Sequence, residues 1–319
     1  MLRPLLVVLG LLTAFFLVAV VFAWRYQERI VWQPPPAGPV RDGAWGPVVR
    51  QVTYAAEDGQ PLFGYLVSAD GAADGRARRA ERARGDGGDP PPPPIARRED
   101  PPARRGRVLV AFHGNAETAA ETVAWARELS ARTHWSVFVP EYRGYAGLPG
   151  LPTYEGSRRD ARAAYAWVRD SLGVPPEQVG LFGFSLGSAV ATELASEVRP
   201  AVLVLQAPFT SARDMARVAA SWPVATVWRA IARVHFDKRQ RVAELAAPVW
   251  VVHGDVDRVI PVRMGRAVHA AARSKGALLE IRGAGHTDVA EHGREAYWHF
   301  LQQALGAGDT RSAAAPTTR

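Results

Sequence analysis

A serine between two glycines stands out among the residues that can do chemistry. It follows an apolar run at 179–182 and precedes an apolar helical pattern that opens near Ser188. On a sharp turn between a strand and a helix, a serine hydroxyl is lifted clear of the sheet, and side chains two residues before and after it would collide with the backbone. The sequence Gly183-Phe184-Ser185-Leu186-Gly187 therefore predicts Ser185 as a nucleophile, with Gly183 and Gly187 forming the turn.

A serine hydroxyl needs a base to take its proton, and that base needs a carboxylate to orient it. His286 follows the last strand-like run, 277–281, on a glycine-rich loop that can bring its ring back over the sheet edge, so we predict it as the base. Two carboxylates follow the run 249–252; we favour Asp257 as the acid and keep Asp255 as the alternative. A turn carboxylate that only caps backbone amides is the plainer interpretation of Asp255.

Acyl transfer passes through an oxyanion, which two backbone N–H groups must stabilise. One belongs to Leu186, directly after the nucleophile, at the start of a helix whose amides face developing negative charge. The second is expected in the loop after the run 108–112, where the chain reads His113-Gly114-Asn115-Ala116. We predict Asn115 as this donor, keep Ala116 as the alternative if the loop is shifted by one residue, and expect a structural role for His113.

These residues require a sheet that brings distant loops to one edge. Short runs of β-branched and apolar residues recur along the chain, and continuous rather than alternating runs are typical of strands buried on both faces of a parallel sheet. Helical patterns with a 3.6-residue period separate the runs. We expect an α/β fold with a mostly parallel, doubly wound sheet preceded by an antiparallel hairpin. The expected strands are 48–54 and 62–67 in the hairpin, then 108–112, 137–139, 179–182, 202–205, 249–252 and 277–281.

The stretch between the expected strands 202–205 and 249–252 has only about forty residues, which leaves room for one or two helices and a minimal cap. Its apolar residues either line a pocket for an acyl chain near a membrane or cover the sheet as core. Both interpretations stay open at this stage. The residues concerned are Trp222, Val224, Val227, Trp228 and Ile231.

Residues 5–24 are free of charge and almost all apolar. At 1.5 Å per residue, a helix of this length spans a hydrocarbon core of roughly 30 Å. We interpret residues 1–30 as a single-pass membrane anchor with its flank; a signal peptide cut after Ala23 is the alternative, which the long apolar run disfavours. The positive charges on the two sides of this run are nearly balanced, with Arg3 and the N-terminal amine before it and Arg25 and Arg29 after it. We expect the catalytic domain on the non-cytoplasmic side.

Half of the formal net charge of +8 lies in residues 71–107, which contain ten arginines and six acidic residues. This segment is dominated by Gly, Arg, Asp and Pro and cannot bury apolar surface, so we expect a disordered insert at 71–106. A basic tether to phosphate groups is the alternative, which the interspersed acids weaken. The catalytic domain is then residues 46–306, followed by a disordered tail at 307–319, and no nucleic-acid partner is expected.

Composition narrows the chemistry further. The chain contains no cysteine, which excludes disulfides, thiol nucleophiles and cysteine metal sites. Its eight histidines form no metal-ligand pattern, so we expect neither a metal nor a cofactor. The sequence gives no indication of the oligomeric state.

The motifs together resemble those of membrane-anchored α/β-hydrolase-domain proteins, serine hydrolases whose eukaryotic members include protein depalmitoylases. The resemblance covers roughly residues 5–305 and includes the apolar N-terminal helix with the segment that follows it, 27–35. It implies the α/β-hydrolase fold, with a triad in the chain order Ser185, Asp257, His286. The matching motifs are His113-Gly114-Asn115-Ala116, Glu141-Tyr142-Arg143-Gly144-Tyr145, Gly183 to Gly187, His253 to Pro261 and Gly285-His286.

Two segments depart from that family. Residues 146–150 read Ala-Gly-Leu-Pro-Gly, where relatives usually have a glycine and a serine, and the insert at 71–106 is unlike the family pattern. The first departure bears on substrate preference and leaves the triad intact.

We therefore expect a serine hydrolase that cleaves a carboxylic ester or thioester through an acyl-enzyme intermediate, acting on a small-molecule or lipid-like acyl substrate. A serine peptidase of the same fold is one alternative, but such enzymes commonly carry an extra domain or cap that selects peptides, and none is visible here. A non-catalytic, membrane-anchored binding protein is the other. It would have no reason to keep nucleophile, base, acid and oxyanion loop at compatible positions.

Overall fold

The computed structural model describes residues 2–36, 45–69 and 106–312. Within these ranges eight strands form one sheet in the order β1-β2-β4-β3-β5-β6-β7-β8. β1 and β2 form an antiparallel hairpin, β2 is antiparallel to β4, and all other neighbours are parallel. The predicted fold class is thus confirmed. The strands are β1 (Val49–Ala55), β2 (Pro61–Val67), β3 (Val108–Phe112), β4 (Ser136–Pro140), β5 (Val179–Phe184), β6 (Leu203–Gln206), β7 (Val249–Gly254) and β8 (Lys275–Ile281).

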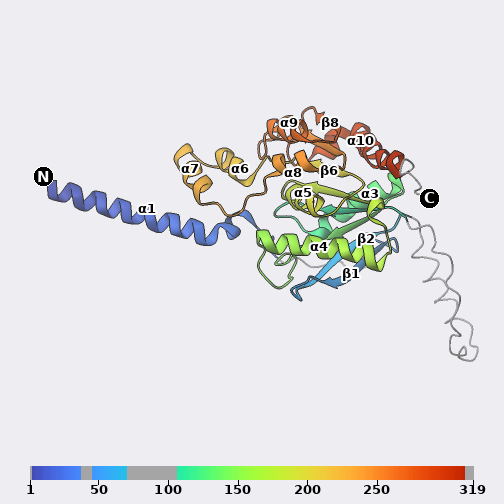
Figure 1. Cartoon of the computed structure of the whole chain (residues 1–319), viewed down its shortest axis with the longest axis horizontal. Helices are drawn as coiled ribbons and strands as arrows, with labels where there is room; N and C mark the ends of the chain where they lie inside the picture. The colour runs from blue at the N-terminus through green and yellow to red at the C-terminus, as the bar shows by residue number, and fades with distance from the viewer. Residues whose placement is uncertain (1, 37–44, 70–105, 313–319) are drawn as a thin grey trace, which may run out of the picture.

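Helices cover both faces of this sheet, as Figure 1 shows. One core lies between the sheet and α4, α5, α8 and α9; the other lies between the sheet and α3 and α10. The central strands therefore bury both faces, which explains their continuous apolar runs. The helices are α1 (Leu2–Val31), α3 (Ala119–Thr133), α4 (Tyr154–Ser171), the 3₁₀ turn η1 (Pro176–Gln178), α5 (Leu186–Glu197), α6 (Ala212–Ala219), α7 (Trp222–Ile231), α8 (Lys238–Glu244), α9 (Val262–Ala271) and α10 (Val289–Ser312).

The segments predicted to be disordered fall largely outside the described residues. This holds for the insert at 71–106, apart from Gly106, and for residues 313–319 of the tail. The preceding part of that tail, 307–312, is helical, because α10 continues to Ser312.

α1 holds a 26-residue apolar span, Leu6–Val31, whose most apolar window is not buried against the rest of the chain. Its length and composition suit both a membrane anchor and a signal sequence. Figure 1 shows α1 extending away from the domain, with its C-terminal end next to it.

The C-terminal end of α1 is built into the domain. Just after the helix, Trp32 is only 2% exposed and packs edge-on against Tyr142, Tyr145 and Phe236. Inside the helix, the side-chain oxygen of Gln27 accepts hydrogen bonds from the backbone N–H groups of residues 233 and 234. The base of α1 therefore forms part of the packed structure and is not joined to it by a free linker.

This packing predicts that replacing Trp32 and replacing Trp222 by alanine change the free energy of unfolding by different amounts. Trp32→Ala leaves a cavity among three aromatic rings and should lower the free energy of unfolding by about 3–5 kcal/mol. Trp222→Ala is the matched control, because Trp222 is 81% exposed and its truncation should change that energy by less than about 0.5 kcal/mol. Guanidinium unfolding of both variants in detergent, followed by far-UV circular dichroism, measures the difference. Equal losses would contradict the structural role of Trp32.

Candidate active site

The turn between β5 and α5 gives Ser185 an unusual backbone. Its φ of 53° and ψ of −114° lie outside the regions that L-residues favour, as expected for a serine on a strained strand-to-helix turn. A Cβ added at Gly183 would lie 2.3 Å from the carbonyl oxygen of Gly187, and one added at Gly187 would lie 2.2 Å from that of Phe112. Both positions therefore require glycine, for the steric reason that the sequence suggested.

Three predicted residues from three loops meet in one hydrogen-bonded chain. Nε2 of His286 lies 3.0 Å from Oγ of Ser185, and its Nδ1 lies 2.7 Å from Oδ2 of Asp257. These residues follow β5, β7 and β8, whose carboxyl ends share one edge of the sheet. The arrangement can pass a proton from the serine to the imidazole while the carboxylate faces the other ring nitrogen.

Asp257 is held as a carboxylate. Its Oδ1 accepts backbone N–H groups of Val259 and Ile260, each at 2.8 Å. Burial by itself raises the pKa of Asp257, but hydrogen bonds from His253, His286 and Ile260 outweigh burial and hold the pKa below the ordinary value. The group can therefore stabilise a positive charge on His286 across the neutral pH range.

His253 contributes to this site although sequence reasoning gave it no role. Its side chain is fully buried, and its Nε2 lies 2.8 Å from the carbonyl oxygen of Ile260 and 3.2 Å from Oδ2 of Asp257. The sequence signals for it were a polar residue near the end of an otherwise apolar strand, β7, and its place at the start of the matching motif His253 to Pro261. The spacing did not show that it faces the acid.

Asp255, the alternative to Asp257 as the acid, is bonded to the backbone of the loop after β8. Its Oδ1 accepts the backbone N–H of Gly283 at 2.7 Å, on the loop that carries His286. The Asp288 carboxylate accepts the N–H of Gly285 at 2.6 Å in the same loop. The ring of Phe184 lies 5.1 Å from that of His286. Asp255 thus has the amide-capping contact considered for it, and the backbone just before the histidine is held at Gly283 and Gly285.

The buried ring of His113 holds the predicted oxyanion loop in place. This ring is buried, with Nε2 2.9 Å from Oε1 of Glu141, and the Tyr142 hydroxyl donates to the carbonyl of His113. His113 therefore anchors the loop that carries both candidate oxyanion donors, Asn115 and Ala116.

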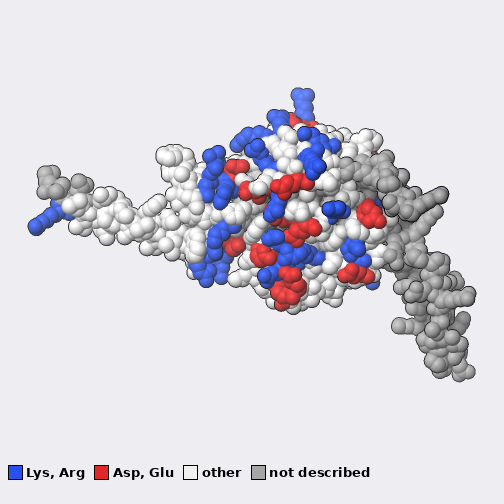
Figure 2. All heavy atoms as spheres, viewed as in Figure 1, with Lys and Arg blue, Asp and Glu red and all other residues white. Residues whose placement is uncertain are grey.

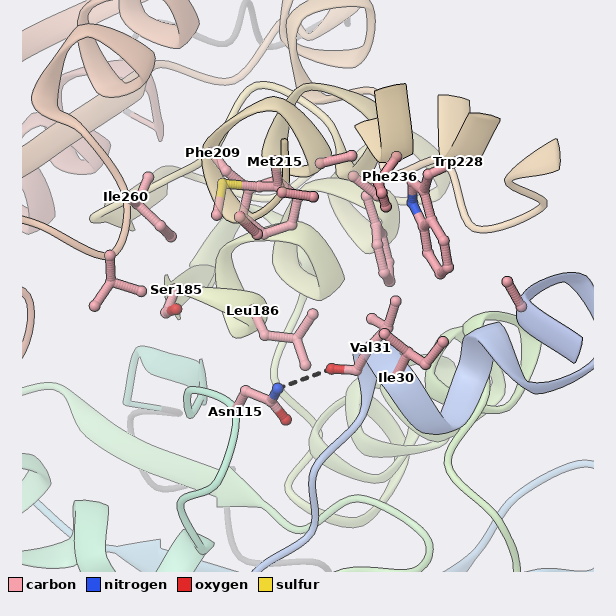
Figure 3. Close-up of a pocket in the computed structure, with 17 residues that line it drawn as sticks. Ile30, Val31, Asn115, Ser185, Leu186, Phe209, Met215, Trp228, Phe236 and Ile260 are labelled. Carbon is pink, nitrogen blue, oxygen red and sulfur yellow. Dashed lines mark hydrogen bonds between the residues drawn. The ribbon is translucent and has the colours of Figure 1, made fainter. Parts of the chain in front are cut away.

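Asn115 and Leu186 line the same pocket as Ser185, as Figure 3 shows. The carboxamide of Asn115 is engaged elsewhere: its Nδ2 donates to the carbonyl of Val31 at 2.8 Å, and its Oδ1 accepts the N–H of Gln33 at 2.9 Å. The side chain positions the loop, which leaves the backbone N–H as the group to face an oxyanion. The donor roles of both residues stay predictions.

The pocket beside Ser185 has a volume of about 560 Å³ and a mostly apolar lining. Its walls come from the end of α1, from α6 and α7, and from the loops after β6 and β7. Val224 and Trp228 line it, whereas Trp222 points to solvent, so α7 borders a pocket and does not cover the sheet. Other lining residues are Ile30, Val31, Phe209, Met215, Phe236 and Ile260.

Comparison with known proteins agrees with this fold. The model of the alpha/beta hydrolase fold family matches residues 107–233. The uncharacterized protein Rv2307c of Mycobacterium tuberculosis is 31% identical over 271 residues, covering 84% of this chain and 83% of that protein. The chain belongs to the α/β-hydrolase family. Human alpha/beta hydrolase domain-containing protein 17B is 28% identical over 199 residues, 62% of this chain and 67% of that protein.

Two solved structures show the same fold as this α/β hydrolase. The Pyrococcus furiosus esterase Pf2001 has a TM-score of 0.59 at 15% identity, covering 86% of this chain and 100% of the esterase. A puromycin-hydrolyzing peptidase of Mycobacterium tuberculosis has a TM-score of 0.59 at 16% identity, covering 84% of this chain and 41% of the peptidase. Within the residues described for the hydrolase, no cluster of three metal-ligating side chains occurs.

The hydrolase buries a lysine against Phe209, one of the residues that line the pocket. Nζ of Lys238 lies 3.0 Å from the centre of the Phe209 ring and has no hydrogen-bond partner among the described residues. Burial lowers the pKa of Lys238 well below its ordinary value, although the nearby carboxylate of Glu193 opposes the shift. Burying this amine without a hydrogen-bond partner among the described residues costs folding stability.

This burial predicts a pH dependence of stability. Because the folded pKa of Lys238 is lowered, its amine binds more protons in the unfolded chain between the folded pKa and about 10.4, so the contribution of Lys238 to stability rises with pH in that window. Lys238→Met removes the effect, so the variant should be at least as stable as wild type near neutral pH, with the difference shrinking toward pH 10. Urea midpoints across this range test it, with exposed Lys275→Met as control. A variant that is strongly destabilised at neutral pH would contradict the prediction.

Proposed function

We propose that the hydrolase cleaves carboxylic esters or thioesters through an acyl-enzyme formed on Ser185. The observation that carries the proposal is the hydrogen-bonded chain from Ser185 through His286 to Asp257, at the wall of an apolar pocket. The names of solved structures with this fold, which include the Pyrococcus furiosus esterase and an acetyl xylan esterase from Paenibacillus sp. R4, point the same way.

The proposed reaction uses these atoms in order. As Oγ of Ser185 bonds to the acyl carbon, its proton passes to Nε2 of His286, and the Asp257 carboxylate stabilises the imidazolium. The backbone N–H groups of Leu186 and Asn115 stabilise the oxyanion. Collapse of the intermediate breaks the bond to the alcohol or thiol, which takes the proton from His286. A water molecule then attacks the acyl carbon while Nε2 of His286 takes its proton. Collapse of this second intermediate returns the proton to Oγ of Ser185 and releases the acid.

The alternatives receive less support. A peptidase is suggested by one neighbour of the same fold, but this chain corresponds to only 41% of that peptidase. The wall of the pocket here is largely apolar, which suits an acyl chain better than a peptide backbone with its polar groups. A pure binding protein would leave the strained backbone of Ser185 without a purpose.

Replacing the nucleophile tests the reaction. Ser185→Ala should lower kcat/KM for p-nitrophenyl esters by about 10³-fold or more, because the oxyanion donors and binding remain but the nucleophile is lost. Ser196→Ala, further along α5, is the matched control and should retain activity. A series from acetate to palmitate in the same assay gives the preferred acyl length. Faster turnover of matched amides than of esters would favour the peptidase.

Substituting the two aspartates of the loop after β7 in turn distinguishes the catalytic acid from a residue that only supports the loop. Asp257→Asn should lower kcat by about 10³- to 10⁴-fold, because the amide cannot hold the correct tautomer or stabilise the imidazolium. The comparison is made at pH 8, where the lowered pKa of Asp257 keeps the wild-type group ionised. Asp255→Asn should cost much less, because Asp255 contacts only the loop backbone. Equal losses in the two variants would contradict the assignment.

A further inference from the structure

α7 lies against α1. A groove of about 440 Å³ runs along the line where the two helices meet, and residues of both helices line it. The α1 side consists of Phe16, Ala19, Val20 and Ala23, all within the charge-free run of that helix. α7 therefore packs beside the segment of α1 that is apolar enough to lie in a bilayer.

Aromatic and basic side chains gather around the C-terminal end of α1. The guanidinium of Arg233 lies 4.5 Å from the centre of the Trp24 ring, and those of Arg25 and Arg29 lie over the Tyr26 ring. Trp, Tyr and Arg are the residues that gather at the boundary between lipid and water. Phe16 precedes Trp24 by about two helical turns, roughly 12 Å along the axis. With Trp24 at the boundary, the part of α7 beside Phe16 lies below the surface of the bilayer.

The sequence of the α6–α7 region fits that position. Residues 218–228 carry no charge, yet Trp222 is 81% and Val224 58% exposed. On either side, residues 211–233 contain four arginines and one aspartate. An exposed apolar tip flanked by arginines is typical of a segment that enters a membrane surface rich in anionic head groups. Figure 2 shows basic side chains gathered at the end of the domain next to α1, whereas α1 and the tip beside it are largely uncharged.

The groove adjoins the pocket that holds the nucleophile. Ala23 of α1 and Val224 and Trp228 of α7 line both the groove and the pocket beside Ser185. The same apolar walls therefore run from the lipid-facing sides of the two helices toward the reacting hydroxyl.

We propose that α7 lies in the bilayer beside α1 and that the Ser185 pocket opens toward the membrane. The acyl chain of a membrane-resident lipid ester then reaches Ser185 without crossing water. This inference rests on the proposed function and on α1 as an anchor. It names the substrate class as a long-chain lipid ester and the docking surface as the lipid bilayer.

The absence of cysteine makes the placement of α7 directly measurable. Thr226→Cys on α7 and Gln303→Cys on α10 are both exposed positions and each would give one label site. The full chain, labelled with an environment-sensitive fluorophore, is reconstituted in vesicles of phosphatidylcholine and phosphatidylglycerol. We expect the label at 226 to be quenched by lipids carrying a nitroxide on the acyl chain, and the label at 303 by aqueous iodide. Equal iodide quenching at both positions would overturn the inference.

A second experiment tests the entrance. Trp222→Asp places a charge on the tip without disturbing the fold, because an acidic residue in the first turn of a helix is favourable. Trp222 lines the groove but not the Ser185 pocket. Hydrolysis of a long-chain lipid ester in vesicles should fall by about tenfold or more, because burying the charge in lipid is costly. Hydrolysis of water-soluble p-nitrophenyl acetate should stay unchanged, and Trp222→Leu should behave as wild type on both.

The outcomes separate the two proposals. Equal rates of Trp222→Asp and wild type on the vesicle substrate would reject the membrane entrance and leave the esterase proposal standing. If wild type cleaves neither substrate, the proposed function fails, and the inferred lipid substrate fails with it. The quenching experiment would then decide the placement of α7 alone.

Discussion

The carboxamide of Asn115 is the interaction on which the geometry of the site depends. It donates to the carbonyl of Val31, accepts from the N–H of Gln33 and accepts from the Tyr145 hydroxyl. One side chain thus joins the end of α1, the loop beside Ser185 and the segment after β4. Because all its bonds go to other segments, a shift in any of them would move the backbone N–H that we propose as an oxyanion donor.

The segment after β4 carries the rest of this support. Glu141 accepts hydrogen bonds from His113 and from the first amide of α3, while the guanidinium of Arg143 pairs with the nearly buried Asp160. Such a buried pair contributes little net stability, but removing one partner leaves an unpaired charge and is costly. These contacts therefore matter because they fix one position of the loop. They give a structural role to the motif Glu141-Tyr142-Arg143-Gly144-Tyr145, which contains none of the predicted catalytic residues.

Much of the fold could be predicted because its local signals agree with the final packing. Strands buried on both faces must be continuously apolar, so runs such as 108–112 were visible, and the glycines around Ser185 follow from steric necessity. The contact of His253 with Asp257 was not visible, because nothing in the spacing shows which way a ring turns at the end of a strand. The wall that α1 adds to the pocket was hidden for a similar reason: an apolar anchor has the same sequence whether or not its last turns pack on the domain.

That wall also bears on the fate of the N-terminal helix. A cut after Ala23 would leave Gln27 and Trp32 in place, so the packed base of α1 would survive. It would, however, remove the α1 side of the groove and leave the apolar face of α7 without a partner. An exposed patch of this kind, with Trp222 at its tip, is a liability in water and an advantage in lipid. With α7 placed in the bilayer as proposed, the packing of α7 on α1 favours a retained anchor, because the anchor holds this apolar face at the membrane.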